Sequence, residues 1–285
     1  EDSGAAGELD IGELLAGDGH DVEQFDIGSA ERVAQAAGEG TEFDRIVVAG
    51  GDGSLALAAE QAERLRVPLG VVAAGTANDF ARRMGLPDDL EEAARLAGSG
   101  DRTRRIDIAD LGGRSFLNVA SLGLAPAAAE AAHELKARLG PLAYAIGAVR
   151  AGATAEPFPA RVVCDGSEVF DGEAWQITVG STGAFGGGSQ IDADADDGML
   201  DVVVIEGGPR AALARRAYGL RRGGVEEQAG VHDSRGAAVE VECGPGEALN
   251  IDGEVCEVTS VGHDGGERGS IRFGVRPQAL ELVIG

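Results

Sequence analysis

A glycine-rich segment that carries one carboxylate is the first feature of the sequence that could bind a phosphate group. Gly50-Gly51-Asp52-Gly53-Ser54 follows an apolar run at 45–49 and precedes a stretch rich in Ala, Leu and Glu at 55–65. Glycines have no Cβ atom, so the backbone can bring its N–H groups close to phosphate oxygens at the start of a helix. Asp52 repels phosphate and therefore needs Mg²⁺ or a hydroxyl group as its partner. A tight turn between a strand and a helix explains the same glycines equally well.

A second polar loop, Gly75-Thr76-Ala77-Asn78, follows the next apolar run, at 68–74. Thr76 and Asn78 offer neutral hydrogen bonds, and ligands of α/β sheets bind beyond the carboxyl ends of the strands. We therefore expect the two loops to border one crevice. The alternative is an ordinary connection in which Asp79 caps a helix over 80–84.

Two carboxylates in the second half of the chain could accept the proton of a hydroxyl group. They are Asp252 and Glu254, in the segment Asn250-Ile251-Asp252-Gly253-Glu254. At positions i and i+2 of an extended segment the two side chains point the same way. One of them could act as the base while the other holds a metal or orients the first. The sequence leaves this assignment open, and a plain Ile-Asp-Gly hairpin turn is the alternative.

An acidic loop, Asp192-Ala193-Asp194-Ala195-Asp196-Asp197-Gly198, is a candidate metal site. Carboxylate oxygens at short spacing, with a glycine for the turn, suit Mg²⁺ or Ca²⁺. Ordinary surface charge is the alternative in so acidic a chain.

The composition limits the classes of protein to which the chain can belong. Its 285 residues include 49 acidic and 24 basic side chains, and the formal net charge is −25. Such a chain repels a phosphate backbone, which excludes non-specific nucleic-acid binding. Lys136 is the only lysine and lies in no Gly-Lys-Ser/Thr or Val-Ala-Ile-Lys motif, which excludes a P-loop and a protein-kinase site. Excess carboxylate with almost no lysine favours adaptation to high salt over an acidic protein from a GC-rich genome.

The cysteines and the apolar runs indicate the compartment. Cys164, Cys243 and Cys256 are far apart in the sequence, which is typical of reduced thiols in a cytoplasmic protein. No apolar run approaches the roughly 20 residues that span a membrane, and no signal peptide is recognised.

The apolar pattern predicts an α/β domain with a parallel sheet over residues 1–109, followed by a mostly β domain over 110–285. In the first domain, strands at 45–49 and 68–74 alternate with helices at 55–65, 79–84 and 88–98. In the second domain we expect helices at 126–151 and near 210–220. The strands expected from 105 onward lie at 105–109, 115–119, 161–164, 174–179, 200–205, 238–242, 254–258, 270–275 and 280–284.

The pairing of Gly-Gly-Asp-Gly-Ser with Gly-Thr-Ala-Asn-Asp-Phe-Ala-Arg resembles the diacylglycerol-kinase-like catalytic family, in its bacterial and archaeal lipid-kinase branch. The resemblance extends from about Asp44 to the C-terminus, through the segments 104–107, 116–121, 139–144, 185–188 and 197–202. It implies a nucleotide-binding domain, a sandwich-like β domain whose last strand packs back on the first domain, and an active site between them. The implied reaction is the ATP- and Mg²⁺-dependent transfer of a γ-phosphate to a lipid hydroxyl.

The same resemblance assigns residues to roles. ATP would lie against Gly50–Ser54 and against Gly75, Thr76 and Asn78. A structural Mg²⁺ would be held by Asp194, Asp197 and the carbonyl of Met199, and the Asp252–Glu254 turn would supply the proton acceptor. The family opens with an Asn-Pro-x-Ser-Gly loop, of which only Ser3-Gly4 is a candidate remnant here; the loop is either missing or lies upstream of residue 1. An NAD kinase-like enzyme and an inactive nucleotide-binding regulator remain the alternatives.

The expected partner is a lipid substrate at a membrane surface, with no nucleic acid and with a homodimer as a candidate assembly. Diacylglycerol-like, sphingoid and ether-lipid acceptors all fit. We expect a cytoplasmic protein at the inner face of the membrane. A stretch without acidic residues could approach anionic headgroups, and a solvated helix is the alternative. Its basic residues are Arg210, Arg215, Arg216, Arg221 and Arg222.

Overall fold

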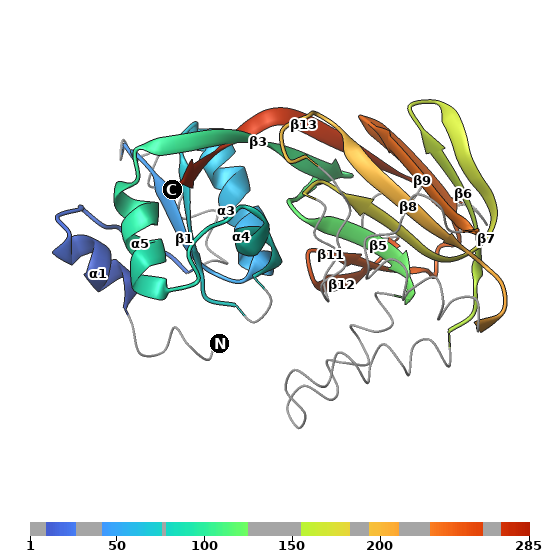
Figure 1. Cartoon of the computed structure of the whole chain (residues 1–285), viewed down its shortest axis with the longest axis horizontal. Helices are drawn as coiled ribbons and strands as arrows, with labels where there is room; N and C mark the ends of the chain where they lie inside the picture. Colours follow the sequence, from blue (N-terminus) through green and yellow to red (C-terminus); the bar gives the residue numbers. More distant parts are fainter. Residues whose placement is uncertain are drawn as a thin grey trace, which may run out of the picture. The chain divides into compact units, whose positions relative to one another are not determined.

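The chain folds into two units, and it crosses from one to the other twice (Figure 1). The first unit comprises Glu1–Ile108 and Pro277–Gly285, and the second comprises Ala109–Arg276. Each is described by itself. The computed structural model describes residues 10–26, 42–75, 78–124, 155–182, 194–210, 229–258 and 269–285.

Parallel strands form the centre of the first unit. β1 (Ile46–Gly50) pairs with β2 (Leu69–Ala73), and the end of β13 (Gly269–Ile284) pairs with the other edge of β2. All five residues of β2 are buried, as expected for a strand flanked on both edges. The helices of this unit are α1 (Ile11–Gly17), α3 (Asp52–Leu65), α4 (Asp79–Arg83) and α5 (Leu90–Ser99).

Small residues let α5 lie close against β2. A Cβ atom at Gly70 would stand 2.5 Å from the carbonyl oxygen of Ala97, so only glycine fits at this position of the strand. Val72 of β2 packs with Ala93, Ala94 and Ala97 of α5 in one apolar cluster. This contact fixes the strand whose carboxyl end carries the second polar loop.

The described part of the second unit consists mainly of antiparallel strands. Its strands are β4 (Arg114–Phe116), β5 (Val119–Gly123), β6 (Phe158–Cys164), β7 (Ser167–Gly180), β8 (Leu200–Glu206), β9 (Val231–Gly236), β10 (Ala238–Cys243), β11 (Ala248–Ile251) and β12 (Glu254–Glu257). They follow the order β13-β10-β6-β7-β5-β11-β12, and β8 pairs with both β7 and β9.

The long strand β7 organises the core of this unit. Its first half pairs with β6, and its second half pairs with both β5 and β8. Side chains from these strands form one apolar cluster, which includes Phe116, Phe158, Ile177 and Phe273. The predicted fold class is confirmed: a sheet with helices in the first unit, followed by a mostly β, sandwich-like second unit.

Several element boundaries differ from the predicted ones. β9 and β11 were not predicted. The predicted strand 115–119 is divided, because the backbone turns away from strand pairing at residues 117 and 118. β13 is continuous through Pro277, where two strands were expected. Gln278, at φ 49°, donates its N–H to the buried carboxylate of Asp107 at 2.7 Å, which gives this irregular position a hydrogen-bond partner.

The predicted helix at 126–151 lies outside the described residues. The predicted helix near 210–220 also lies outside them, except for its first residue. In the described part of the chain, no helix has the length and apolar character needed to cross a membrane.

Candidate active site

The two glycine-rich loops contact each other through their backbones. A Cβ atom at Gly75 would lie 2.6 Å from the Cα atom of Gly51, a distance that real side chains do not reach. The N–H of Ala74 donates to the carbonyl oxygen of Gly50 at 2.9 Å, which ties the end of β2 to the end of β1. The structure therefore brings Gly50–Gly51 and Gly75 together. Gly75 must lack a side chain, and a Cβ atom at Gly51 would be in tight contact, 3.3 Å from the Cα atom of Gly75.

The first turn of α3 begins at this crossing. Its N-cap residue, Gly51, provides no side-chain hydrogen bond to the helix, and Asp52, Gly53 and Ser54 form the first turn. N–H groups at a helix start carry partial positive charge and bind anions. A small pocket opens here, and its lining residues are Val48, Gly50, Gly51, Asp52, Leu55, Val71, Ala73, Asn78 and Ala81.

Asn78 closes the pocket from the second loop. It adopts a left-handed backbone conformation, with φ 52°, and its amide group donates to the carbonyl oxygen of Ala73 at 3.3 Å. Its buried Oδ1 atom has no hydrogen-bond partner among the described residues. A buried polar atom of this kind is uncommon and suggests that a ligand supplies the missing donor. Thr76 lies outside the described residues.

Asp52 caps the neighbouring helix. Its carboxylate accepts the N–H of Phe80 at 3.2 Å and the N–H of Asp79 at 3.4 Å, so it satisfies the first turn of α4. The cap expected from Asp79 is therefore supplied by Asp52. Burial raises the pKa of Asp79, the charge of Asp52 raises it further, and Arg82, 3.2 Å away, opposes the shift. The two carboxylates repel each other, and a cation would relieve that repulsion.

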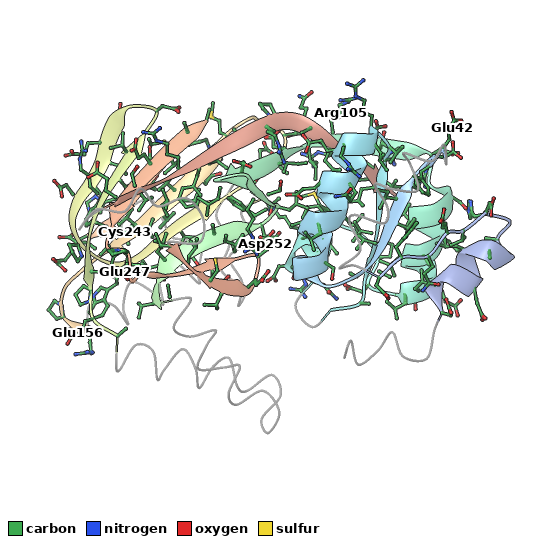
Figure 2. The ribbon with its side chains drawn as sticks, turned by 180° about the vertical axis from the view of Figure 1, so that it is seen from behind. Glu42, Arg105, Glu156, Cys243, Glu247 and Asp252 are labelled. Carbon is green, nitrogen blue, oxygen red and sulfur yellow. The ribbon has the colours of Figure 1, made fainter. Side chains whose placement is uncertain are left out.

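Asp252 occupies a tight turn between β11 and β12 (Figure 2). It has φ 46° and Gly253 has φ 92°, which is the geometry of a two-residue hairpin turn. The Asn250 side chain accepts the N–H of Gly253 at 3.0 Å and stabilises the turn. The hairpin is therefore present, and its first central residue carries the candidate carboxylate.

The Asp252 side chain binds the backbone at the start of β5. One oxygen accepts the N–H of Leu117 at 2.8 Å, and the other accepts the N–H groups of Asn118 and Val119 at 2.9 Å each. Only 8% of the residue is exposed. Hydrogen bonds from N–H groups to a carboxylate are stronger than bonds between neutral groups, so this carboxylate is firmly oriented.

Glu254 lies in a different environment from Asp252. Its side chain is 66% exposed and pairs with the guanidinium of Arg114 at 2.6 Å. We expected the side chains of Asp252 and Glu254 to point the same way because we assumed an extended backbone. Asp252 instead adopts a left-handed conformation in the turn. The structure therefore distinguishes a buried, fixed carboxylate from an exposed, ion-paired one.

One carboxylate of the acidic loop, that of Asp197, pairs with an arginine. Asp197 accepts the N–H of Met199 at 3.0 Å with one oxygen, and its other oxygen lies 3.3 Å from Arg235. Among the described residues, no group of three or more His, Cys, Asp or Glu side chains is arranged to hold a metal ion. The metal site that the resemblance implied at Asp194, Asp197 and Met199 stays a prediction, and the structure adds an arginine paired with one of its carboxylates.

The basic stretch is described only at its first residue. Arg210 donates to the carbonyl oxygen of Ala155 at 3.0 Å, and its guanidinium lies 5.9 Å from the centre of the Trp175 ring. It is thus held against its own unit. Arg215, Arg216, Arg221 and Arg222 lie outside the described residues.

Sequence reasoning missed three contributors to these sites. Arg114 and Arg235 pair with carboxylates far from them in the sequence, and Asn118 accepts a hydrogen bond from the Thr182 hydroxyl at 3.1 Å while its own N–H binds Asp252. No local pattern marks these partners. The one available signal was polar character, since Asn118 and Thr182 are polar residues inside strand-like, apolar surroundings.

Comparisons with known proteins agree with this architecture. The family described as the diacylglycerol kinase catalytic domain matches residues 7–111, and the YegS C-terminal NAD kinase beta sandwich-like domain matches residues 118–284. The diacylglycerol kinase of Mycobacterium tuberculosis strain H37Rv is 32% identical over 253 residues, which cover 86% of this chain and 79% of the relative. The diacylglycerol kinase of Bacillus subtilis is 32% identical over 219 residues, which cover 75% of this chain and 72% of the relative.

Solved structures share the fold. A diacylglycerol kinase from Bacillus anthracis superimposes with a TM-score of 0.61 at 17% identity, covering 93% of this chain and 85% of that chain. An NAD kinase from Archaeoglobus fulgidus, in complex with ATP, superimposes with a TM-score of 0.55 at 16% identity. The match covers 96% of this chain and 88% of that chain. At these identities the likeness concerns the fold alone. The two matched domains, together with relatives of 32% identity over most of their length, show that the chain belongs to the diacylglycerol kinase family and is a lipid kinase, a phosphotransferase.

Proposed function

We propose that this kinase transfers the γ-phosphate of ATP to the hydroxyl group of a diacylglycerol-like lipid, with Mg²⁺ as the metal. The observation that carries the proposal is the backbone contact of Gly51 with Gly75 at the start of α3. It joins two loops and a helix N-terminus into one surface that suits phosphate.

The nucleotide phosphates lie against Gly50–Ser54 in this proposal. N–H groups of the first turn of α3 donate to phosphate oxygens, and the absence of a side-chain cap at Gly51 supports this role. Gly75, Thr76 and Asn78 form the other wall. The unpartnered Oδ1 atom of Asn78 accepts a hydrogen bond from the nucleotide.

The metal is assigned to Asp52 and Asp79. Mg²⁺ is usually bound by one or two carboxylates, with phosphate oxygens and water completing its coordination. Burial and then the charge of Asp52 raise the pKa of Asp79, which fits such a pair. When bound, Mg²⁺ neutralises negative charge on the transferred phosphate.

Asp252 is assigned as the proton acceptor. Phosphoryl transfer proceeds through a loose transition state, so orientation of the hydroxyl matters more than the strength of the base. Three backbone N–H groups fix the Asp252 carboxylate, whereas the exposed Glu254 depends on Arg114 for its orientation. Asp252 therefore orients the lipid hydroxyl and receives its proton, and Glu254 has a supporting role.

The acceptor is best tested by competition between chemical classes. ATP labelled at its γ-phosphate is supplied with Mg²⁺ to mixed micelles of diacylglycerol, sphingosine or a diether glycerol, and separately to NAD in buffer. We expect label on diacylglycerol, at least tenfold above the other lipids and NAD. Label on NAD alone would overturn the proposal and restore the NAD kinase-like alternative. Label chiefly on sphingosine or on the diether would show that this lipid, and not diacylglycerol, is the acceptor.

The composition and the lipid acceptor lead to two subsidiary proposals. The enzyme works at the inner face of a cytoplasmic membrane, and its acidic surface is adapted to high salt. Near 1 M salt the Debye length is about 3 Å, so the self-repulsion of a chain of charge −25 is screened. Thermal melting in KCl tests the second point: a melting temperature that is highest near 0.1 M KCl would contradict it.

A further inference from the structure

We infer that the guanidinium group of Arg235, and not a bound divalent cation, holds the described part of the acidic loop, residues 194–198, against the start of β8 in this chain. The ion cluster lies in the second unit and does not depend on the proposed reaction, whereas its positioning role rests on that reaction. The inference starts from the pairing of Arg235 with a carboxylate to which the resemblance assigned a metal.

Arg235 bridges two carboxylates that the fold places opposite it. Asp201 on β8 is the cross-strand partner of Arg235 on β9. The Nε atom of Arg235 donates to Asp201 at 3.0 Å, and one of its terminal nitrogens lies 3.3 Å from Asp197. Arginine is always charged, and its planar group of donors matches carboxylates, so it suits this position better than lysine.

The loop offers its carboxylates to the arginine rather than to a metal. One oxygen of Asp197 caps the N–H of Met199 at 3.0 Å, and the other faces Arg235. Asp201 accepts the hydrogen bond from the Arg235 guanidinium, and the charges of Asp197 and Asp194 also act on it. The guanidinium thus interacts with all three carboxylates, and a divalent cation at Asp197 would be repelled by it.

Strand register connects this ion cluster to the candidate proton acceptor. Arg235 pairs with Asp201, Asp201 pairs with Gly180 on β7, and Gly180 pairs with Val119 on β5. Val119 in turn donates its N–H to Asp252. One row of residues across four strands therefore runs from Arg235 to the acceptor turn, which makes Arg235 a positioning residue.

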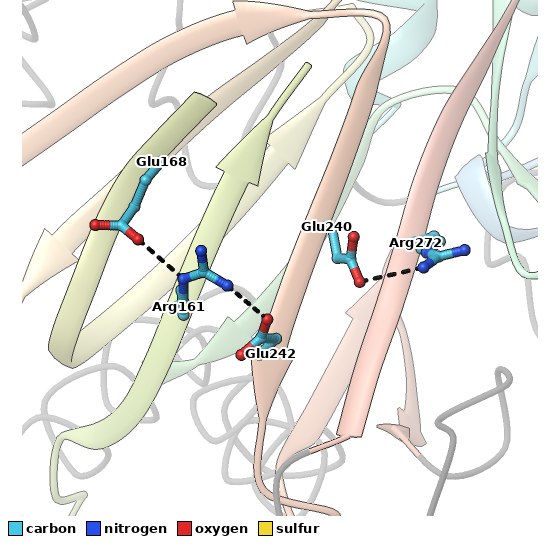
Figure 3. Close-up of polar contacts among 5 residues, drawn as sticks. All are labelled: Arg161, Glu168, Glu240, Glu242 and Arg272. Atoms are coloured by element: carbon cyan, nitrogen blue, oxygen red, sulfur yellow. Dashed lines mark hydrogen bonds and ion pairs between the residues drawn. The ribbon is translucent and has the colours of Figure 1, made fainter. Parts of the chain in front are cut away.

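The sheet offers two matched controls (Figure 3). Arg161 on β6 also bridges two carboxylates, Glu168 and Glu242, each at 2.9 Å. Arg272 on β13 makes a single, longer contact with Glu240 at 3.4 Å. Neither belongs to the acidic loop.

The test measures thermal melting of Arg235→Met, Arg161→Met and Arg272→Met in EDTA and in millimolar Mg²⁺ or Ca²⁺. We expect Arg235→Met to lower the melting temperature in EDTA by at least about 3 °C, and Arg272→Met to leave it within about 1 °C of wild type. With the guanidinium gone, Arg235→Met should regain stability when the metal is added, because its carboxylates are released. Arg161→Met should show no such recovery. Arg235→Lys should restore part of the stability.

Two results would overturn the inference. One is an unchanged melting temperature for Arg235→Met in EDTA. The other is a wild-type melting temperature that rises with Mg²⁺ or Ca²⁺, with a rise that persists in Asp79→Asn and disappears in Asp197→Asn. The Asp79→Asn background separates this loop from the metal proposed in the first unit.

Turnover distinguishes positioning from stability alone. If the proposed lipid kinase reaction holds, Arg235→Met should lower kcat several-fold below its melting temperature and leave the KM for ATP unchanged. A kcat equal to wild type would refute the positioning role while leaving the thermal result to decide the ion cluster.

Discussion

Asp52 and Asp252 are both followed by glycine, and both accept backbone N–H groups from a distant part of the chain, yet they are held very differently. Asp52 accepts two bonds of 3.2 and 3.4 Å and has Asp79, a second carboxylate, beside it. Asp252 accepts three bonds of 2.8 to 2.9 Å and is almost fully buried. The difference teaches that backbone N–H groups fix the Asp252 carboxylate, whereas Asp52 lies beside a second carboxylate whose charge the proposed Mg²⁺ would offset.

Asp252→Asn should produce the largest effect. We expect turnover to fall at least about 100-fold, within the range measured for general bases. The amide also loses charge-assisted bonds to the start of β5, so the melting temperature should fall as well. Steady-state kinetics with γ-labelled ATP measure the first effect and thermal melting the second.

Glu254→Gln is the matched control for Asp252→Asn. Its side chain is exposed, so turnover should fall less than about tenfold. Equal losses in both variants would show that the two carboxylates act as one unit and would remove the contrast between them.

Gly75→Ala should weaken the nucleotide side of the molecule. The added Cβ atom would lie 2.6 Å from the Gly51 Cα atom, so the two loops must separate. Overpacking of this kind costs about 1–3 kcal/mol, and we expect a higher KM for ATP and a lower melting temperature. Gly53→Ala is the control for folding, because its Cβ atom would meet nothing within 4 Å. Equal melting temperatures for the two variants would contradict the backbone contact.

Asp79→Asn should separate stability from metal use. Because the pKa of Asp79 is raised, the folded protein favours the protonated form of this carboxyl group. The stability that this form contributes below pH 3.8 is lost as the pH rises from 3.8 through the raised pKa. At neutral pH and without metal, the variant should therefore melt higher than wild type, and the difference should vanish at low pH. The Mg²⁺ concentration for half-maximal activity should increase. A lower melting temperature at neutral pH would contradict the repulsion between Asp52 and Asp79.

Arg114→Met should have the smallest effect. The Arg114–Glu254 pair lies at the surface, where such pairs contribute about 0–1 kcal/mol. We expect turnover within about threefold of wild type and little change in melting. A loss as large as that of Asp252→Asn would move the proton acceptor to Glu254.

Local patterns could predict the strands and the glycine loops. The runs that become β1 and β2 are apolar and end in glycine, and α3 and α5 follow their predicted positions closely. The continuity of β13 could not be predicted, because proline normally interrupts a strand, and the partner of Gln278 lies 171 residues away.

The long-range contacts of the site were beyond sequence reasoning for the same reason. The N–H groups that hold Asp252 come from residues 133 to 135 positions earlier in the chain, and nothing in the local sequence identifies them. Arg235 shows the converse case. The acidic loop looks like a metal site in the sequence, and only the register of β8 and β9 reveals the arginine opposite Asp201.

The central claim is that a fixed carboxylate at Asp252 accepts the proton of a lipid hydroxyl during phosphoryl transfer from ATP. The most direct measurement follows label from the γ-phosphate of ATP into diacylglycerol, with wild type, Asp252→Asn and Glu254→Gln side by side in Mg²⁺ and in EDTA. The account predicts Mg²⁺-dependent labelling that Glu254→Gln largely retains and Asp252→Asn loses. Labelling of diacylglycerol by Asp252→Asn at a near wild-type rate would contradict it.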